Sequence, residues 1–157
     1  MRTIHFCDEN ADKTKRYSLG RIWDRNKPQA MFIMRNPSKA GLIENDHTLT
    51  RCINFAKAWG FGGVQVGNLY AHREHAILNF DPENVQALKE MAEECDIIVC
   101  AWGNNSVDVD LRFLPEHKLV CIDQNQNGSP KNPARILGTR VYKPFKLNTN
   151  ELDNINK

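Results

Sequence analysis

The stretch Ala30-Met-Phe-Ile-Met34 decides the fold class. This apolar run is too short for a helix, and turn-forming residues border it, with Pro28 before it and Asn36-Pro37-Ser38 after it. We therefore predict a buried strand that ends in a polar loop. A second apolar run, Asp96-Ile-Ile-Val-Cys-Ala-Trp102, stops at Gly103 and predicts another buried strand.

Helical patterns separate the predicted strands. Asp46 and its neighbours can cap a helix, and apolar residues recur at helical spacing from Leu49 to Trp59. Residues 82–95 show a second helical pattern. Apolar and polar residues alternate loosely over 17–23. We expect three further strands: one over 64–66 with its exit at 68–70, one over 119–122 and a last one over 139–142.

This alternation predicts an α/β fold, a three-layer sandwich with a mostly parallel central sheet. We expect one domain over residues 1–146 and a polar, flexible tail over 147–157. Ligands of such sheets bind beyond the carboxyl ends of the strands, where polar, turn-forming segments follow each predicted strand.

The composition excludes several protein classes. The chain has 157 residues, of which 41% are apolar and 25% charged, which suits one domain with its own core. No apolar run approaches the ~20 residues that cross a bilayer, and the N-terminus lacks a signal-peptide pattern. The five cysteines are an odd number, and Cys52, Cys100 and Cys121 lie in apolar surroundings. We therefore expect reduced thiols, a cytoplasmic location and no membrane partner.

Charge is distributed unevenly along the chain. Residues 1–51 hold 10 Lys and Arg against 6 Asp and Glu, residues 52–116 hold 4 against 10, and residues 117–157 hold 7 against 3. If the two basic ends meet, one face can attract phosphate. Taken alone, this pattern is more typical of an ordinary mixed surface.

Standard cofactor and metal motifs are missing from the sequence. Gly60-Phe-Gly-Gly63 lacks the Lys-Ser/Thr pair of a phosphate-binding loop. His72 and His75 have no third metal ligand nearby, and no serine occupies a nucleophile elbow. We predict neither a metal nor a cofactor.

Asparagines and aromatic residues dominate the predicted strand ends. An asparagine amide offers donors and an acceptor to the edge of a nucleobase, and an aromatic ring can stack on its face. Each asparagine alone is typical of a turn or a cap. The recurrence of Asn36, Asn68 and Asn104 at three strand ends favours a base-binding site.

The order of these motifs carries a resemblance. Asn36-Pro37-Ser38, Trp59-Gly-Phe-Gly62, Val66 to Arg73, Ala101-Trp-Gly103 and Gly128 to Pro133 follow one another as in an uncharacterised bacterial and phage domain family. The set is also similar, more distantly, to the uracil-DNA glycosylase superfamily, especially its mismatch-specific branch. The resemblance spans residues 17–137 and implies a glycosylase-like fold.

The resemblance implies roles for individual residues. Asn36 would orient the attacking water or contact the base, Asn68 would read a flipped base, and Asn132 would press on the DNA backbone together with Ser129. Among these and the neighbouring residues, we place base or nucleotide contacts at Pro37, Ser38, Asn68, Tyr70, Trp102 and Asn104, and phosphate contacts at Arg51, Arg73, Ser129, Lys131 and Asn132. Arg51 and Arg73 fit salt-bridge partners equally well.

The chain departs from the glycosylase pattern at the site. Ser38 replaces a glycine, Asn132 stands where faster branches have histidine, and no carboxylate accompanies Asn36. Asp46 is the nearest substitute base, although it also fits a helix cap.

Three functions follow from these observations. The first is a uracil-DNA glycosylase-like hydrolase of DNA repair or modification, which recognises a base in DNA or a nucleotide. The alternative is a non-catalytic binder that senses or sequesters a base or blocks another DNA enzyme. A base-exchange transferase would need a nucleophilic carboxylate, for which Glu44 and Asp46 are the nearest acids. The sequence predicts no oligomeric state.

Overall fold

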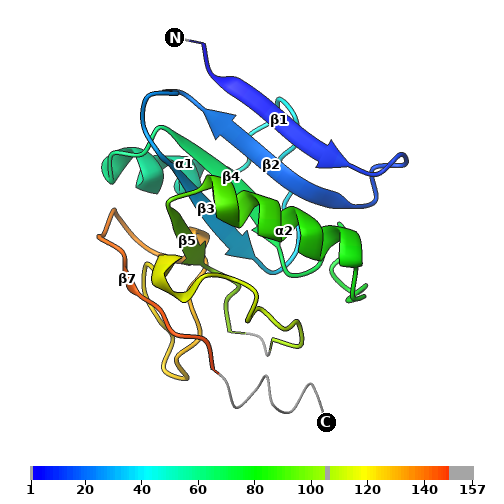
Figure 1. Cartoon of the computed structure of the whole chain (residues 1–157). Coiled ribbons are helices and arrows are strands. Elements are labelled where there is room, and N and C mark those ends of the chain that lie inside the picture. The colour runs from blue at the N-terminus through cyan, green and yellow to red at the C-terminus, as the bar shows by residue number, and fades with distance from the viewer. Residues whose placement is uncertain (1, 105–106, 149–157) are drawn as a thin grey trace.

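The computed structural model describes residues 2–104 and 107–148, which form one mixed sheet with two α-helices (Figure 1). In chain order the elements are β1 (Ile4–Glu9), β2 (Arg16–Ile22), β3 (Gln29–Met34), α1 (His47–Ala58), β4 (Gly63–Asn68), α2 (Pro82–Glu94), β5 (Ile97–Cys100), β6 (Leu119–Cys121) and β7 (Lys143–Pro144). Two short 3-10 helices, η1 (Glu116–Lys118) and η2 (Pro133–Arg135), flank β6 and its following loop.

The fold is α/β as predicted, but the sheet is mixed, so the prediction of a mostly parallel sheet is wrong. The strand order is β1-β2-β4-β3-β5-β6-β7. The pairings of β4, β3, β5 and β6 are parallel, whereas β1 with β2, β2 with β4 and β6 with β7 pair antiparallel. β1 and β2 are joined by a short turn, which permits only antiparallel pairing, because parallel strands need a long crossover.

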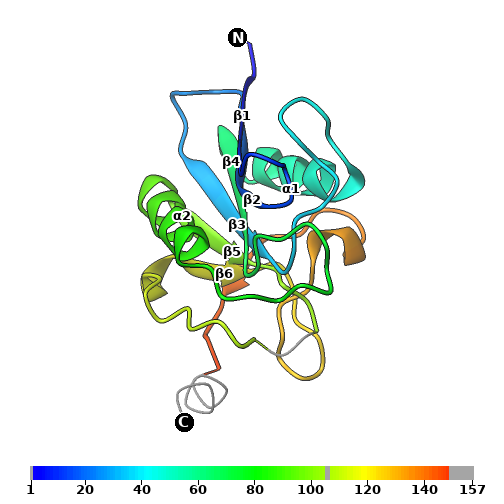
Figure 2. The same cartoon turned by 90° about the vertical axis from the view of Figure 1, so that its right-hand side faces the viewer.

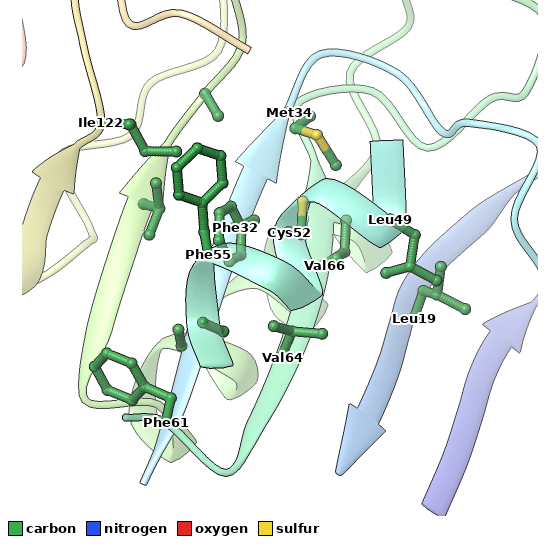
Figure 3. Packing of buried hydrophobic residues seen from close by; sticks show 14 of the residues in the cluster. Leu19, Phe32, Met34, Leu49, Cys52, Phe55, Phe61, Val64, Val66 and Ile122 are labelled. Carbon is green, nitrogen blue, oxygen red and sulfur yellow. The ribbon is translucent and has the colours of Figure 1, made fainter. Parts of the chain in front are cut away.

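The two helices lie on opposite faces of the sheet (Figure 2). Alternate residues of β3 supply both cores: Phe32 packs on the α1 side, and Met31 packs on the α2 side. On the α1 side, Leu49 and Phe55 of the helix meet Val66 of β4 in a continuous apolar cluster (Figure 3). The sheet is therefore buried on both sides along its centre.

Both predicted helices are confirmed, and their ends follow from capping residues. Asp46 accepts a hydrogen bond from the backbone N–H of Leu49 at 2.8 Å, which starts α1. Asp81 does the same for Glu83 at 3.0 Å, and Pro82 occupies the first turn of α2.

The strands differ from the prediction at both ends of the chain. The strand predicted at 139–142 lies at Lys143–Pro144 instead, where it pairs with β6. β1 was not predicted. Most of the tail predicted at 147–157 lies outside the described residues, which end at 148. Neither helix of the described part has the length and apolar character that a bilayer span requires.

The strand order fixes where a ligand can bind. The connection from β3 runs through α1 to β4 on one side, and β5 lies on the other side of β3. In parallel sheets a crevice opens at such a reversal, beyond the carboxyl ends of the strands. Here the reversal lies between β3 and β5, directly before Arg35-Asn36 and Ala101-Trp102.

Candidate functional site

A cavity of about 840 Å³ opens at the carboxyl ends of β3 and β5. Six of the predicted site residues line it: Asn36, Ser38, Trp102, Asn104, Lys131 and Asn132. Five further lining residues carry polar side chains that the sequence analysis did not select: Arg35, Thr48, His75, Asn125 and Arg135. The cavity thus gathers residues from five parts of the sequence: 34–38, Thr48, His75, 102–104 and 125–135.

Arg35 and Asn36 form the wall that follows β3. The guanidinium of Arg35 lies over the ring of Tyr70, 5.7 Å from the ring centroid, and its Nη1 donates to Asn36 Oδ1 at 3.4 Å. Arg35 Nε and Asn36 Nδ2 are buried and have no hydrogen-bond partner among the described residues. Unpaired buried donors are uncommon and need an explanation, which a bound acceptor group would supply.

Trp102 and Asn104 form the opposite wall, after β5. Trp102 is 6% exposed, and its ring meets Phe145 edge-to-face at 5.7 Å. Asn104 accepts hydrogen bonds from Asn127 Nδ2 and, at 3.3 Å, from Ser129 Oγ. Ser129 therefore does not line the cavity itself but supports a residue that does.

Lys131, Asn132 and Arg135 close the cavity on the side of η2. Asn132 caps this short helix, because its Oδ1 accepts from the backbone N–H of Ala134 at 2.9 Å. Lys131 Nζ lies 3.6 Å from a carboxylate oxygen of Asp123. The predicted phosphate contacts of the 129–132 segment thus reduce to Lys131 and Asn132 at the cavity.

Buried arginines of β2 hold the loop that carries Asn36 and Ser38. Arg16 is 1% exposed; its Nη1 donates to the carbonyl oxygens of Ser38 (3.3 Å) and Ala40 (2.9 Å). Its Nη2 donates to Asn68 Oδ1 at 3.3 Å. Burial, followed by the nearby charge of Arg73, lowers the pKa of Arg16 to about 10, so the group stays protonated at neutral pH.

Arg21, the second arginine of β2, fastens the next part of the same loop. It donates to the carbonyl oxygens of Gly41 (2.7 Å) and Glu44 (3.2 Å) and to Asn45 Oδ1 (3.0 Å). Most of these acceptors are main-chain carbonyls, so the loop path from 38 to 45 is set by side chains that lie outside it.

Asp46 is the helix cap rather than a residue of the cavity wall. Its carboxylate accepts from the backbone N–H groups of Leu49 (2.8 Å) and Ala40 (3.1 Å) and is hydrogen-bonded to the side chain of Ser38. Burial alone would raise the pKa of Asp46, but these hydrogen bonds hold that pKa below its ordinary value. The carboxylate is ionised, but these hydrogen bonds occupy it. Its partner Ser38, and not Asp46 itself, lines the cavity.

Arg51 and Arg73 do not line the cavity. Arg51 donates to two carbonyl oxygens of the 136–138 segment, both at 2.7 Å. Arg73 forms an ion pair with Glu9 at 2.9 Å and donates to the Ser38 carbonyl at 3.2 Å. Arg73 is thus a salt-bridge partner, whereas Arg51 donates to main-chain carbonyl oxygens rather than to a carboxylate.

Pro37, Asn68 and Tyr70 lie behind the cavity wall. All three are buried, and none of them lines the cavity. Asn68 is 1% exposed, and its carbonyl oxygen accepts from Asn84 Nδ2 at 2.7 Å. Its position places it in contact with Arg16, whereas the resemblance implies a base-reading role.

The cavity wall carries positive charge and no negative charge. Arg35, Lys131 and Arg135 line it, and no Asp or Glu of the described residues does so. Such a wall attracts anions and offers hydrogen-bond donors to them. Within residues 2–104 and 107–148, no group of three or more His, Cys, Asp and Glu side chains is placed to hold a metal ion.

The residues that the sequence analysis missed differ in how visible they were. Arg35 directly follows the apolar run that defines β3 and precedes Asn36, so its adjacency to the motif was a usable signal. Arg16 offered none, because nothing in its neighbourhood shows that it reaches the carbonyls of a loop 22 residues later.

No curated protein and no solved structure matches the chain. A family model described as a protein of unknown function, DUF1643, matches residues 16–134. The match begins at Arg16 and covers all of the cavity wall described above except Arg135. An uncharacterised family was predicted from the ordered motifs, and the chain belongs to the DUF1643 family.

Proposed function

We propose that the protein is a uracil-DNA glycosylase-like protein whose cavity recognises a nucleobase, held either in DNA or in a nucleotide. The observation that carries this proposal is the composition of one cavity: the amides of Asn36, Asn104 and Asn132, the ring of Trp102, and a cationic wall without carboxylates. Amides match the edge of a base, an aromatic ring its face, and cations its phosphate. The proposal includes the three-layer arrangement that the resemblance implies.

Hydrolysis of the N-glycosidic bond is the first of two activities that we consider for this cavity. The sugar becomes oxocarbenium-like in the transition state, and the base leaves with negative charge. The unpaired Asn36 Nδ2 is a donor for a base oxygen, and the cation of Arg35 next to it stabilises the charge that develops there. A base in duplex DNA must first leave the stack to reach such a cavity.

A specific observation favours a second candidate function, which is binding without hydrolysis. Asp46 is the cap of α1, and its carboxylate is engaged by two backbone N–H groups and Ser38. Glu44 does not line the cavity either. His75 lines the wall, but its Nε2 lies 3.3 Å from the carbonyl oxygen of Pro37. An amide such as Asn36 orients water but does not remove its proton, so the described wall offers no carboxylate as a general base. The same observation speaks against base exchange through a carboxylate nucleophile.

Oligonucleotides distinguish these two functions. The protein is incubated with single- and double-stranded oligonucleotides that carry uracil, hydroxymethyluracil or other altered bases, and binding is measured by fluorescence anisotropy. Alkaline strand cleavage then reports abasic product. Asn36→Ala is the test variant. Asn26→Ala is its matched control, because Asn26 is exposed in the turn that precedes β3, at the opposite end of the sheet.

Each outcome decides between the functions. Abasic product that is lost in Asn36→Ala and kept in Asn26→Ala supports hydrolysis. Base-dependent binding that weakens in Asn36→Ala, without product from the unmodified chain, supports the binder. If no oligonucleotide or nucleotide binds to the unmodified chain, base recognition is wrong.

A further inference from the structure

We infer that Arg35 and Arg135 form a phosphate-binding subsite in the cavity, with Lys131 as a weaker third contact. The assignment of the phosphate to a nucleotide rests on the proposed function, whereas the subsite itself rests on the geometry below. Arg51 and Arg73, which the sequence analysis placed among the phosphate contacts with the salt bridge as an equal alternative, are engaged elsewhere.

The guanidinium plane of Arg35 is held in an orientation in which it can bind an anion. The ring of Tyr70 supports the guanidinium from one side, and Asn36 Oδ1 accepts from Nη1 at 3.4 Å. Within the described residues Nη2 has no hydrogen-bond partner, and it is not one of the buried unpaired atoms, so this donor of the fork is left for a ligand. A guanidinium fork matches two oxygens of one phosphate, which a lysine ammonium cannot do.

The three cations of the cavity differ in whether a nearby carboxylate neutralises their charge. Within the described residues, neither Arg35 nor Arg135 forms an ion pair with an Asp or Glu. Lys131 lies 3.6 Å from Asp123, which also pairs with Arg140 at 2.8 Å. The charge of Lys131 is therefore partly neutralised, whereas within the described residues no carboxylate neutralises the charges of Arg35 and Arg135.

The neighbouring side chains favour a nucleotide phosphate over a lone inorganic anion as the natural ligand. The same cavity holds Trp102 and the amides of Asn36 and Asn132, which a phosphate ion alone would leave without a partner. A nucleoside monophosphate in solution and a phosphodiester in DNA share this chemistry, and the experiment includes both sources.

Inorganic pyrophosphate tests the subsite without any base. Its affinity is measured by isothermal titration calorimetry on the unmodified chain and on Arg35→Gln and Arg135→Gln. Arg25→Gln is the matched control, since it removes the same charge from an exposed position in the turn before β3, at the far end of the sheet. Arg135 is exposed, so its replacement leaves the core intact and keeps the test valid if Arg35→Gln folds poorly.

We expect millimolar or tighter binding to the unmodified chain and an affinity roughly tenfold lower in each of Arg35→Gln and Arg135→Gln, since each removes a charged contact, with Arg25→Gln unchanged. Deoxyuridine monophosphate and a single-stranded oligonucleotide serve as competitors and distinguish the two phosphate sources. For the oligonucleotide, each lost contact lowers the slope of log affinity against log salt by about 0.7.

The subsite and the proposed function can fail separately. If pyrophosphate does not bind, or if it binds both test variants as tightly as it binds the unmodified chain, the subsite is wrong, whatever the oligonucleotides do. If pyrophosphate binds through the two arginines but no nucleotide or oligonucleotide competes, the subsite holds and base recognition is wrong.

Discussion

Replacement of Asp46 by alanine should destabilise the protein by about 2–3 kcal/mol. The carboxylate caps α1 through Leu49 N–H, and the loss of such a cap costs about 1 kcal/mol. It also accepts from Ala40 N–H at 3.1 Å, and a partly buried donor left without an acceptor costs about 1–2 kcal/mol more. For a chain of this size we expect a melting temperature lower by roughly 5–10 °C.

Two further variants divide this loss between the cap and the loop. Asp46→Ser can still cap α1 but cannot reach Ala40 N–H as well, so we expect a loss of about 1–2 kcal/mol. Asp81→Ala removes the cap of α2 and its ion pair with Lys15 without touching the loop that carries Asn36. Urea unfolding measures all three, and only the Asp46 variants should also weaken ligand binding.

The pH dependence gives an independent check. Because the folded pKa of Asp46 is held below its ordinary value of 3.8, the ionised group stabilises the protein above that pH. This contribution is lost as the pH falls through the folded pKa, so the gap between unmodified and Asp46→Ala chains should narrow below about pH 3.8. A variant as stable as the unmodified chain at pH 7, with hydrolysis abolished, would refute the structural role and make Asp46 a catalytic base.

Three other perturbations test the packing. Gly62→Ala should cost about 3 kcal/mol or more in urea unfolding, because a Cβ there would lie 2.0 Å from the backbone oxygen of Asp24; near-normal stability would contradict this contact. Arg51→Ala should lose about 2 kcal/mol through its two carbonyls in the 136–138 segment, yet leave the salt dependence of oligonucleotide binding unchanged; a smaller salt slope would return Arg51 to the phosphate contacts. Burial raises the pKa of Cys7 to about 11, so iodoacetamide at pH 8 should alkylate it slowly in the folded chain and quickly in urea, as mass spectrometry can measure; equal rates would refute its burial.

The sequence predicted the elements whose signals are local. The apolar run before Asn36 marked β3, and Asp46 at the start of a helical pattern marked the cap of α1. It did not predict β1, whose His5 and Asp8 are exposed and interrupt the apolar pattern, nor the position of β7. The orientation and position of these outer strands depend on pairing with distant strands, which periodicity does not encode.

The candidate site was predicted where it depends on strand ends and missed where it depends on long side chains. Asn36, Trp102 and Asn132 line one cavity because the parallel strands end at the same edge. Arg51 was predicted at the site but donates to a carbonyl oxygen outside it, whereas Arg35, for which no role was predicted, lines the cavity. The reach of each guanidinium decides which groups it meets. Local sequence does not specify that reach.

The attachment of the Asn36 loop to Arg16 and Arg21 has a consequence for binding kinetics. The carbonyl oxygens of this loop are bound by side chains of β2, so a ligand meets a backbone whose conformational entropy has already been lost during folding. Association should then proceed without a slow rearrangement step, and affinity differences among ligands should arise mainly from their dissociation rates.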